Sequence, residues 1–402
     1  MKIQRVVWTG ASNYALAPNT PGYRCTTPAK INLFLEILGK RSDGYHNLDT
    51  VMLAVDLTDT LEIYPRESGE LTMELDLSEA QQVGQRQLAL KDPTWDIPTQ
   101  SANSKGASHA LADAGVDAGA NLVLKALDAL RRALETSSSA SSVDRPCGAH
   151  VVLKKRIPSQ AGLGGGSSDA AAALVLGSLL WRHQAQTQQP DAQQPAGAWL
   201  GQIAMQLGSD INFFLQGHNG TRWTARCTER GQIVQPIANN VAIHGLIVHP
   251  PAGCPTGKVF AHLREWLDER TVRETPDRLI AFLEDPTSGE LTGNAAKGAM
   301  GRNGQDTPAQ LARLLYNRLD PAASQSTPWV ERTSRRIDRC DLLGQCLSGS
   351  GSARYALCSE RTQAEALALD LQREGEFRAY PFSAWTSPGV EKQVSIITHS
   401  RT

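Results

Sequence analysis

The chain has 402 residues, 41% of them apolar and 20% charged, which is enough apolar material for a large core and favours two domains over one. Its 40 Lys and Arg residues against 41 Asp and Glu residues give a net charge of −1, without the basic excess of a general nucleic-acid or anionic-membrane binder. No stretch approaches the roughly 20 consecutive apolar residues of a membrane span, and the first 25 residues lack the apolar run of a signal peptide. We therefore expect a soluble, cytoplasmic protein without a nucleic-acid or membrane partner.

The seven cysteines are an odd number without a CxxC pair, and the nine histidines form no HxxxH or HExxH motif. Paired or closely spaced ligands are what a disulfide framework or a structural zinc site needs. The sequence therefore predicts reduced thiols that pack as small apolar groups.

The N-terminal part combines strand and helix patterns with polar insertions. Residues 1–24 have no clear hydrophobic period, and we expect an N-terminal extension there, followed by a first domain over 25–238. Apolar residues two apart between Leu53 and Ile63 predict a β-strand. Leucines near helical spacing predict a helix over 121–135. Polar composition predicts a surface insertion and two connectors, at 75–120, 136–146 and 184–197.

A strand candidate at 150–155, a glycine-rich loop at 158–168 and an apolar helix at 169–181 follow one another directly. A second helix is predicted at 198–207, before the segment GSDINFF at 208–214.

A second domain is expected over 239–402, with strands and helices interleaved. Thr362 and Glu365 stand at capping-box spacing at the start of its last helix. Because strands and helices do not alternate regularly, we expect an α+β fold. Its predicted elements are a strand at 241–250, a helix at 260–269, a glycine-rich loop at 286–307, the segment LSGSGSARYALC at 347–358 and a helix at 362–374.

The loop PSQAGLGGGSS between a strand and an Ala-rich helix is a phosphate-binding arrangement. Glycine permits positive φ and lets the backbone approach an anion, and the free N–H groups of a helix N-terminus hold phosphate oxygens. A flexible linker is the plain alternative, but a linker is not expected between an apolar strand and a buried helix. The dinucleotide fingerprint GxGxxG fails here, GxxxxGK[ST] is absent, and no HRD or DFG tripeptide occurs. Asp169 adds a negative charge near the expected phosphates and could act there through a metal ion.

The segment PSQAGLGGGSSDAAAAL resembles the second motif of the GHMP family of small-molecule kinases, and LSGSGSARYAL resembles its third. Within that family, PAKINLFLEILGKRSDGYH at 28–46 and LGSDINFF at 207–214 are similar to the branch that phosphorylates 4-diphosphocytidyl-2-C-methyl-D-erythritol. The resemblance covers roughly 25–400. It implies a ribosomal-S5-like N-terminal domain, a ferredoxin-like C-terminal domain, and transfer of the ATP γ-phosphoryl group to a tertiary alcohol in the isoprenoid pathway.

The same resemblance implies a role for individual residues. Asp210 matches the catalytic aspartate that accepts the alcohol proton, and Lys30 its electrostatic partner. A helix cap at Asp210 and a solvated lysine at position 30 are the structural alternatives. The residues expected to bind ATP, with Mg²⁺ bridging its phosphates, are Pro158, Ser159, Gln160, Ala161, Gly162, Leu163, Gly164, Gly165, Gly166, Ser167 and Ser168. The Mg²⁺ ligands are not identified.

For the cytidine end, the resemblance implies stacking and hydrogen bonding by Tyr45 and His46. A turn residue at Tyr45 and a core residue at Phe260 are the alternatives to a role in binding. The other expected contacts are Asn32 at the reacting alcohol, Thr256 and Phe260 beside the base, and Gly349, Ser350 and Gly351 of the third glycine motif, for which a structural turn remains an alternative.

The chain departs from the family pattern in its first 24 residues, in the length of the segment 75–120, and at two short segments. Ile211 and Asn212 replace the commoner Val-Pro pair, and NRLD at 317–320 resembles an NDLE segment with its second charge reversed. Three other functions stay open: a kinase for another small alcohol such as homoserine or mevalonate, a related ATP-dependent decarboxylase, and a nucleotide-binding regulator without catalysis. A monomer or weak homodimer is expected.

Overall fold

The computed structural model describes residues 2–9, 16–77, 121–137, 147–185, 196–216, 222–263, 273–287, 307–386 and 395–396. Most of the insertion predicted at 75–120 and of the loop predicted at 286–307 lies outside the described residues. So do most of the two connectors and the second half of the helix predicted at 260–269.

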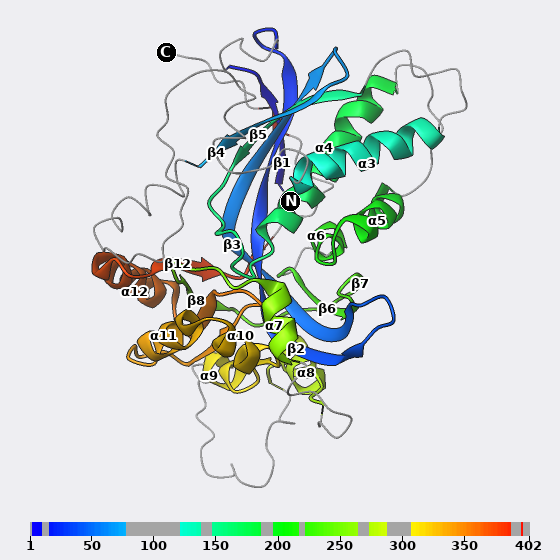
Figure 1. Ribbon diagram of the computed structural model, residues 1–402. Helices are drawn as coiled ribbons and strands as arrows, with labels where there is room; N and C mark the ends of the chain where they lie inside the picture. Colours follow the sequence, from blue (N-terminus) through cyan, green and yellow to red (C-terminus); the bar gives the residue numbers. More distant parts are fainter. Residues whose placement is uncertain are drawn as a thin grey trace.

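A mixed, mostly antiparallel sheet of nine strands is built mainly from the first part of the chain, with β9 and β13 added from the second (Figure 1). Its main path runs in the order β13-β1-β2-β3-β5-β4. Beside this path, β6 pairs with β3, β7 pairs with β6, and β9 pairs with β2. The strands are β1 (Lys2–Val7), β2 (Pro21–Lys40), β3 (His46–Arg66), β4 (Leu71–Asp76), β5 (Gly148–Lys154), β6 (Thr224–Glu229), β7 (Ile233–Pro236), β9 (Tyr316–Asn317) and β13 (Ser395–Ile396).

Helices cover one face of this sheet: α3 (Leu122–Ser137), α4 (Gly165–Ala185), α5 (Ala196–Leu207) and α6 (Ile211–Gln216) (Figure 1). The helix α4 is the central one and packs on β2, β3 and α3. Ala170 and Leu174 have no exposed surface, as expected of a helix that is apolar all round. Its first turn is formed by Gly165–Ser168, so the glycine-rich loop runs directly into the N-terminus of a buried helix.

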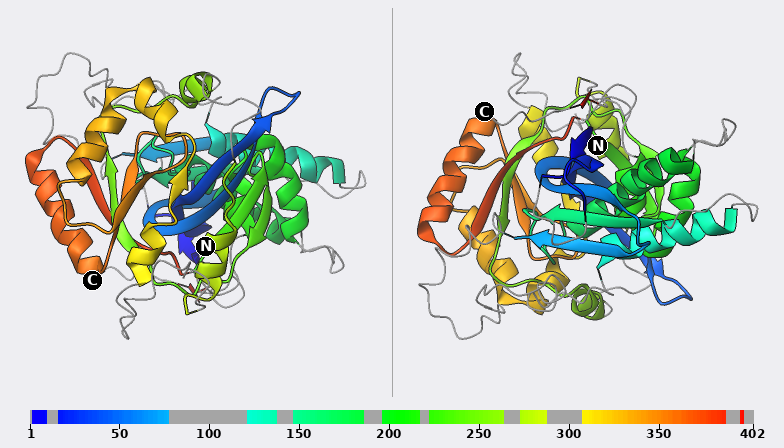
Figure 2. Two further views of the ribbon diagram at one scale, coloured as in Figure 1. Left: turned by 90° about the horizontal axis from the view of Figure 1, so that it is seen from below. Right: turned by 90° about the horizontal axis from the view of Figure 1, so that it is seen from above.

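The second part contains an antiparallel sheet in the order β10-β11-β8-β12. These strands are β10 (Gly344–Leu347), β11 (Arg354–Cys358), β8 (His244–His249) and β12 (Arg378–Ser383). The helices are α7 (Thr256–Leu263), α8 (Asp277–Glu284), α9 (Thr307–Ala312), α10 (Asp320–Ser326), α11 (Pro328–Ile337) and α12 (Arg361–Glu374). The helices α11 and α12 pack against this sheet, as Figures 1 and 2 show for α12.

The two parts share an apolar core. Ile247 and Tyr355 of the smaller sheet belong to one buried cluster with Ile31 of β2 and Leu53 of β3. The Tyr355 hydroxyl also donates a hydrogen bond of 2.8 Å to the carbonyl of Asn32. The middle of β2 is therefore held from both parts of the chain.

The expected α+β architecture is confirmed. The boundary predicted at residue 238 lies between β7 and β8 and stays a prediction. Residues 2–7, predicted as an extension, instead form a strand along the start of β2. The capping box predicted at Thr362 was wrong. The helix α12 already begins at Arg361, and the Glu365 carboxylate accepts a hydrogen bond of 2.9 Å from Arg361 Nε. No helix among the described residues is long and apolar enough to cross a membrane.

Candidate active site

A lysine and an aspartate 180 positions apart in the sequence lie next to each other in the structure. The Nζ of Lys30 lies 3.5 Å from Oδ2 of Asp210, with the lysine side chain 5% exposed and the aspartate 27%. Lys30 Nζ also donates to Oδ1 of Asn32 at 2.7 Å. A buried cation thus faces a carboxylate that solvent or a substrate can reach.

The local sequence explains both positions. Ala29 and Ile31 are buried in the apolar core, and the Lys30 backbone N–H is bound to the carbonyl of Leu163 in the glycine-rich loop at 2.9 Å. Asp210 directly precedes α6, where a capping residue would also stand, but its carboxylate is directed at Lys30. The structure therefore brings together the two residues expected to be catalytic, with Asn32 beside them.

The two glycine-rich segments lie against each other. Ser348 Oγ donates to the carbonyl of Gly162 at 3.0 Å, and Ala353 N–H donates to the carbonyl of Ala161 at 3.3 Å. A Cβ on Gly351 would lie 2.1 Å from the backbone N of Gly162, so only glycine permits this approach. The first segment leads into α4, and the third glycine motif closes over it.

We expect Gly351→Ala to separate the two loops. The added methyl group meets backbone atoms at 2.1 Å, and displacing them by about 1 Å should lower kcat/KM for the nucleotide on the order of 10²-fold. Gly39→Ala is the control, because a Cβ there meets nothing within 4 Å among the described residues. Steady-state kinetics at varied ATP give the comparison; equal kcat/KM for the two variants would refute the close-approach argument.

A pocket of about 330 Å³ opens where these loops meet the start of α7. Thr256 Oγ1 and Ser350 Oγ are hydrogen-bonded across it at 2.9 Å. The lining residues are Gln160, Gly162, Cys254, Pro255, Thr256, Ser350 and Gly351. Cys254 and Pro255 were not foreseen, because an ordinary Cys-Pro pair carries no binding signal in the sequence.

Aromatic residues gather near the turn between β2 and β3. The rings of His46 and Phe260 are stacked with centroids 4.8 Å apart and an interplanar angle of 28°. Phe260 stands one helical turn after Thr256 on α7, so both share a face of that helix. Tyr45 is 56% exposed, and the Arg230 guanidinium lies 4.5 Å above its ring. Arg230 was missed because a lone arginine has no distinguishing pattern in the sequence.

Asp169 occupies a buried ion cluster. Its carboxylate accepts hydrogen bonds from Thr27 Oγ1 at 2.8 Å and from Lys155 Nζ at 2.7 Å, and Lys155 also binds Asp59. The described residues contain no group of three or more His, Cys, Asp or Glu side chains that could hold a metal ion. Asp169 therefore anchors the start of α4 to β3 and β5 through Lys155.

Burial raises the pKa of Asp169 to about 6, and the negative charge of Asp59 adds to the rise while Lys155 opposes it. A folded-state pKa above the ordinary value stabilises the fold below about pH 4, and this stabilisation is lost as the pH rises through about 6. We expect the wild type to lose unfolding free energy between about pH 4 and pH 7 relative to Asp169→Asn. Urea unfolding at both values measures it; a pH-independent difference would contradict this assignment.

Comparison with known proteins identifies the family. The model of the GHMP kinase N-terminal domain matches residues 121–217, which include the glycine-rich loop and Asp210. A 4-diphosphocytidyl-2-C-methyl-D-erythritol kinase of Polaromonas sp. is 31% identical over 335 residues, 83% of either chain. The kinase of the same name from Rhodopirellula baltica is 29% identical over 87% of this chain and 91% of its own.

The chain belongs to the GHMP kinase family. The GHMP kinase fold is also found in a crystal structure of 4-(cytidine 5'-diphospho)-2C-methyl-D-erythritol kinase, with a TM-score of 0.56 and 23% identity over 90% of this chain and 98% of that one. The mevalonate kinase of Methanococcus jannaschii shares it with a TM-score of 0.51 and 15% identity, over 90% of this chain and 98% of that one.

The departures from the family pattern are accommodated in this GHMP kinase. Ile211 is fully buried, and Asn212 Nδ2 donates to the carbonyl of Gln232 at 3.1 Å. The reversed charge at Arg318 is paired with the buried carboxylate of Glu36 at 2.7 Å. Neither change removes a polar group that contacts Lys30 or Asp210.

Proposed function

We propose that the chain transfers the γ-phosphoryl group of ATP to the tertiary hydroxyl of 4-diphosphocytidyl-2-C-methyl-D-erythritol, giving the 2-phosphate and ADP. The observation that carries the proposal is the Lys30–Asp210 pair beside the two joined glycine-rich segments. The relatives that share most of the chain bear the name of this kinase. Phosphoryl transfer depends mainly on positioning and charge neutralisation, which this arrangement offers.

In the proposed step, Asp210 accepts the proton of the substrate hydroxyl as its oxygen bonds to the γ-phosphorus. The bond from that phosphorus to the β,γ-bridging oxygen breaks, and ADP leaves with its electron pair. Lys30 lies 3.5 Å from the carboxylate and offsets negative charge at the transferring group. Asn32 holds Lys30 in place through the 2.7 Å hydrogen bond, and Thr50 in turn accepts from Asn32 Nδ2 at 2.8 Å.

Residues 158–168 and Gly349, Ser350 and Gly351 are proposed to bind the ATP phosphates. Mg²⁺ would neutralise phosphate charge when bound with the nucleotide. The protein would supply few of the ligands of such an ion, and phosphate oxygens would supply the others. The buried Ser168 hydroxyl in the first turn of α4 has no hydrogen-bond partner among the described residues, and we propose it as the protein ligand.

The cytidine end is proposed to lie at Tyr45, His46, Thr256 and Phe260. Two stacked rings beside a pocket suit a planar base, and the imidazole can hydrogen-bond its edge. The proposed setting is the cytoplasm, with small-molecule partners, no nucleic acid or membrane, and a monomer or weak homodimer.

Truncation of the aromatic end tests the substrate assignment. We expect Phe260→Ala to raise KM for the cytidyl substrate about tenfold or more, since stacking on a base is worth ~1–3 kcal/mol, while the affinity for ATP stays within about twofold. Leu369→Ala, at an exposed apolar residue of α12, is the matched control. Coupled ADP release at varied acceptor gives both constants. An unchanged KM for the cytidyl substrate in Phe260→Ala would remove the base from this position.

A further inference from the structure

At Gly349 the third glycine motif approaches the catalytic lysine as closely as it approaches Gly162 of the glycine-rich loop at 158–168. Gly349 has φ of +59°, and a Cβ there would lie 3.3 Å from Lys30 Nζ and 3.5 Å from Asn32 Oδ1. A shift of this loop therefore changes the space around Lys30. The hydrogen bonds of the loop itself are joined by contacts from a more distant residue.

The side chain of Asn317 holds the loop from behind. Its Nδ2 donates to the carbonyls of Leu347 and Gly349, each at 2.8 Å, and its Oδ1 accepts from the N–H of Leu319 at 2.9 Å. The residue is only 6% exposed, and all its amide groups are paired. Because the peptide unit is planar and trans, fixing the Gly349 carbonyl also directs the N–H of Ser350 to the opposite side, and Ser350 lines the pocket.

Asn317 is itself tied to the strand that carries Lys30. It pairs with Leu35 in the short parallel ladder between β9 and β2, and the N–H of Arg318 donates to the carbonyl of Leu35 at 2.8 Å. The Arg318 guanidinium makes two hydrogen bonds of 2.8 and 2.7 Å to Glu36, which has no exposed surface. Asn317 is therefore fixed relative to Lys30, which lies on the same strand five residues before Leu35.

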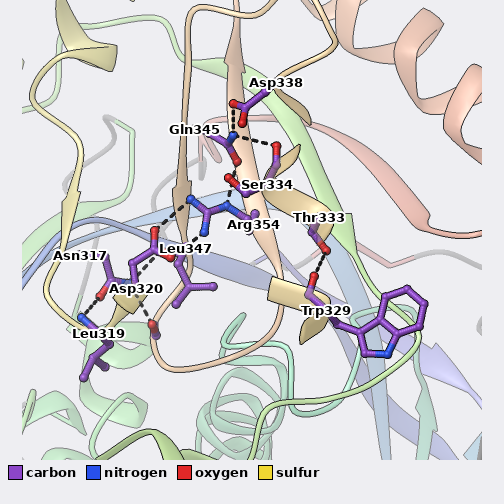
Figure 3. Close-up of polar contacts among 11 residues, drawn as sticks. Asn317, Leu319, Asp320, Trp329, Thr333, Ser334, Asp338, Gln345, Leu347 and Arg354 are labelled. Atoms are coloured by element: carbon purple, nitrogen blue, oxygen red, sulfur yellow. Dashed lines mark hydrogen bonds and ion pairs between the residues drawn. The ribbon is translucent and has the colours of Figure 1, made fainter. Parts of the chain in front are cut away.

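The other end of the segment clamps the strand that leaves the loop. Asp320 accepts two hydrogen bonds from Arg354, at 2.6 and 2.9 Å, and Arg354 Nε donates to Gln345 at 2.8 Å (Figure 3). Figure 3 shows Asn317 and Asp320 on the same side of the loop strands, with Arg354 between Asp320 and Gln345. The segment 317–320 thus joins β2 to both ends of the third glycine motif.

We propose that Asn317 is a positioning residue for phosphoryl transfer, which fixes the position of the third glycine motif relative to Lys30 and the pocket. This rests on the proposed function of the site, because the loop is taken to face the ATP phosphates. Asn317 acts through the Gly349–Ser350 peptide, so its loss should affect nucleotide binding and kcat more than KM for the cytidyl substrate, whose site it reaches only through the hydrogen bond between Ser350 and Thr256.

Asn317→Asp tests the proposal, since it keeps the shape and replaces the donor by an oxygen that repels both carbonyls. We expect kcat to fall on the order of 10²-fold, the Kd of a non-hydrolysable ATP analogue to rise about tenfold, and KM for the cytidyl substrate to rise less than this Kd. Thr333→Val is the matched control, because Thr333 is buried and its hydroxyl donates to Trp329 within α11, away from the loop. It should change kcat and Kd less than twofold.

A second, milder variant tests the proposal if Asn317→Asp does not fold. Ser348→Ala removes the 3.0 Å hydrogen bond to Gly162 and loosens the same loop. It should lower kcat less than Asn317→Asp does, again with a smaller change in KM for the cytidyl substrate. Folded Asn317→Asp with wild-type kcat and nucleotide Kd, or a cytidyl KM that rises as much as kcat falls, would overturn the proposal. If wild-type protein phosphorylates no acceptor, the proposed function fails, and the nucleotide titrations still decide the role of Asn317.

Discussion

Asp210→Asn should lower kcat by about 10²- to 10⁴-fold with little change in KM for either substrate. The substitution keeps the shape of the side chain but removes the carboxylate that accepts the hydroxyl proton, a contribution of this size in general base catalysis. The side chain is 27% exposed and immediately precedes α6, so the fold should tolerate the amide. Coupled ADP release with saturating ATP and cytidyl substrate measures kcat.

Asp370→Asn is the control for that variant, because Asp370 is an exposed carboxylate of α12 that pairs with Arg373 on the same helix. It should retain wild-type kcat. A folded Asp210→Asn protein with more than about half the wild-type kcat would show that another group accepts the proton or that none is needed.

Lys30→Met should lower kcat/KM by about 10²- to 10³-fold, because a cation preorganised at the transferring group is among the strongest contributions to catalysis. Methionine matches the length of the lysine stem in a side chain that is 5% exposed, so packing is largely kept. It also leaves Asn32 Oδ1 without the donor now at 2.7 Å, which should cost ~1–3 kcal/mol of unfolding free energy.

Kinetics and urea unfolding of the same preparation separate these two effects of Lys30→Met. The control Lys125→Met, at an exposed position of α3, should change neither quantity measurably. Loss of stability without loss of kcat/KM would make Lys30 a purely structural partner of Asn32 and contradict its proposed role.

Segments with a repeating local signal could be predicted from the sequence. The helix expected over 121–135 is α3, the apolar run after the glycine-rich loop is α4, and the alternation from Leu53 to Ile63 lies in β3. In α3 and β3 a period of 3.6 or 2 matches one buried face, and the apolar run of α4 matches a helix buried all round, so the pattern and the tertiary contacts agree. The approach of Lys30 to Asp210 followed from the family resemblance, because nothing local joins residues 180 apart.

Elements that depend on distant partners could not be predicted. The strand β1 contains Ile3 and Val6, but it is recognisable only through its pairing with β2. The two residues of β9 are too few to show any period, although Asn317 and Arg318 connect the third glycine motif to Glu36. Glu36 lies between two apolar residues in the sequence, and nothing in that segment indicates its ion pair with Arg318, 282 positions away.

Acceptor specificity measured by ADP release tests the central claim most directly. Wild-type protein is assayed with 4-diphosphocytidyl-2-C-methyl-D-erythritol, homoserine and mevalonate in parallel, with Asp210→Asn as the background. The account predicts turnover with the cytidyl substrate alone, lowered at least about 10²-fold in the variant, with phosphorus NMR placing the new phosphate on the tertiary oxygen. Turnover with homoserine or mevalonate instead, or nucleotide binding without turnover of any acceptor, would contradict it.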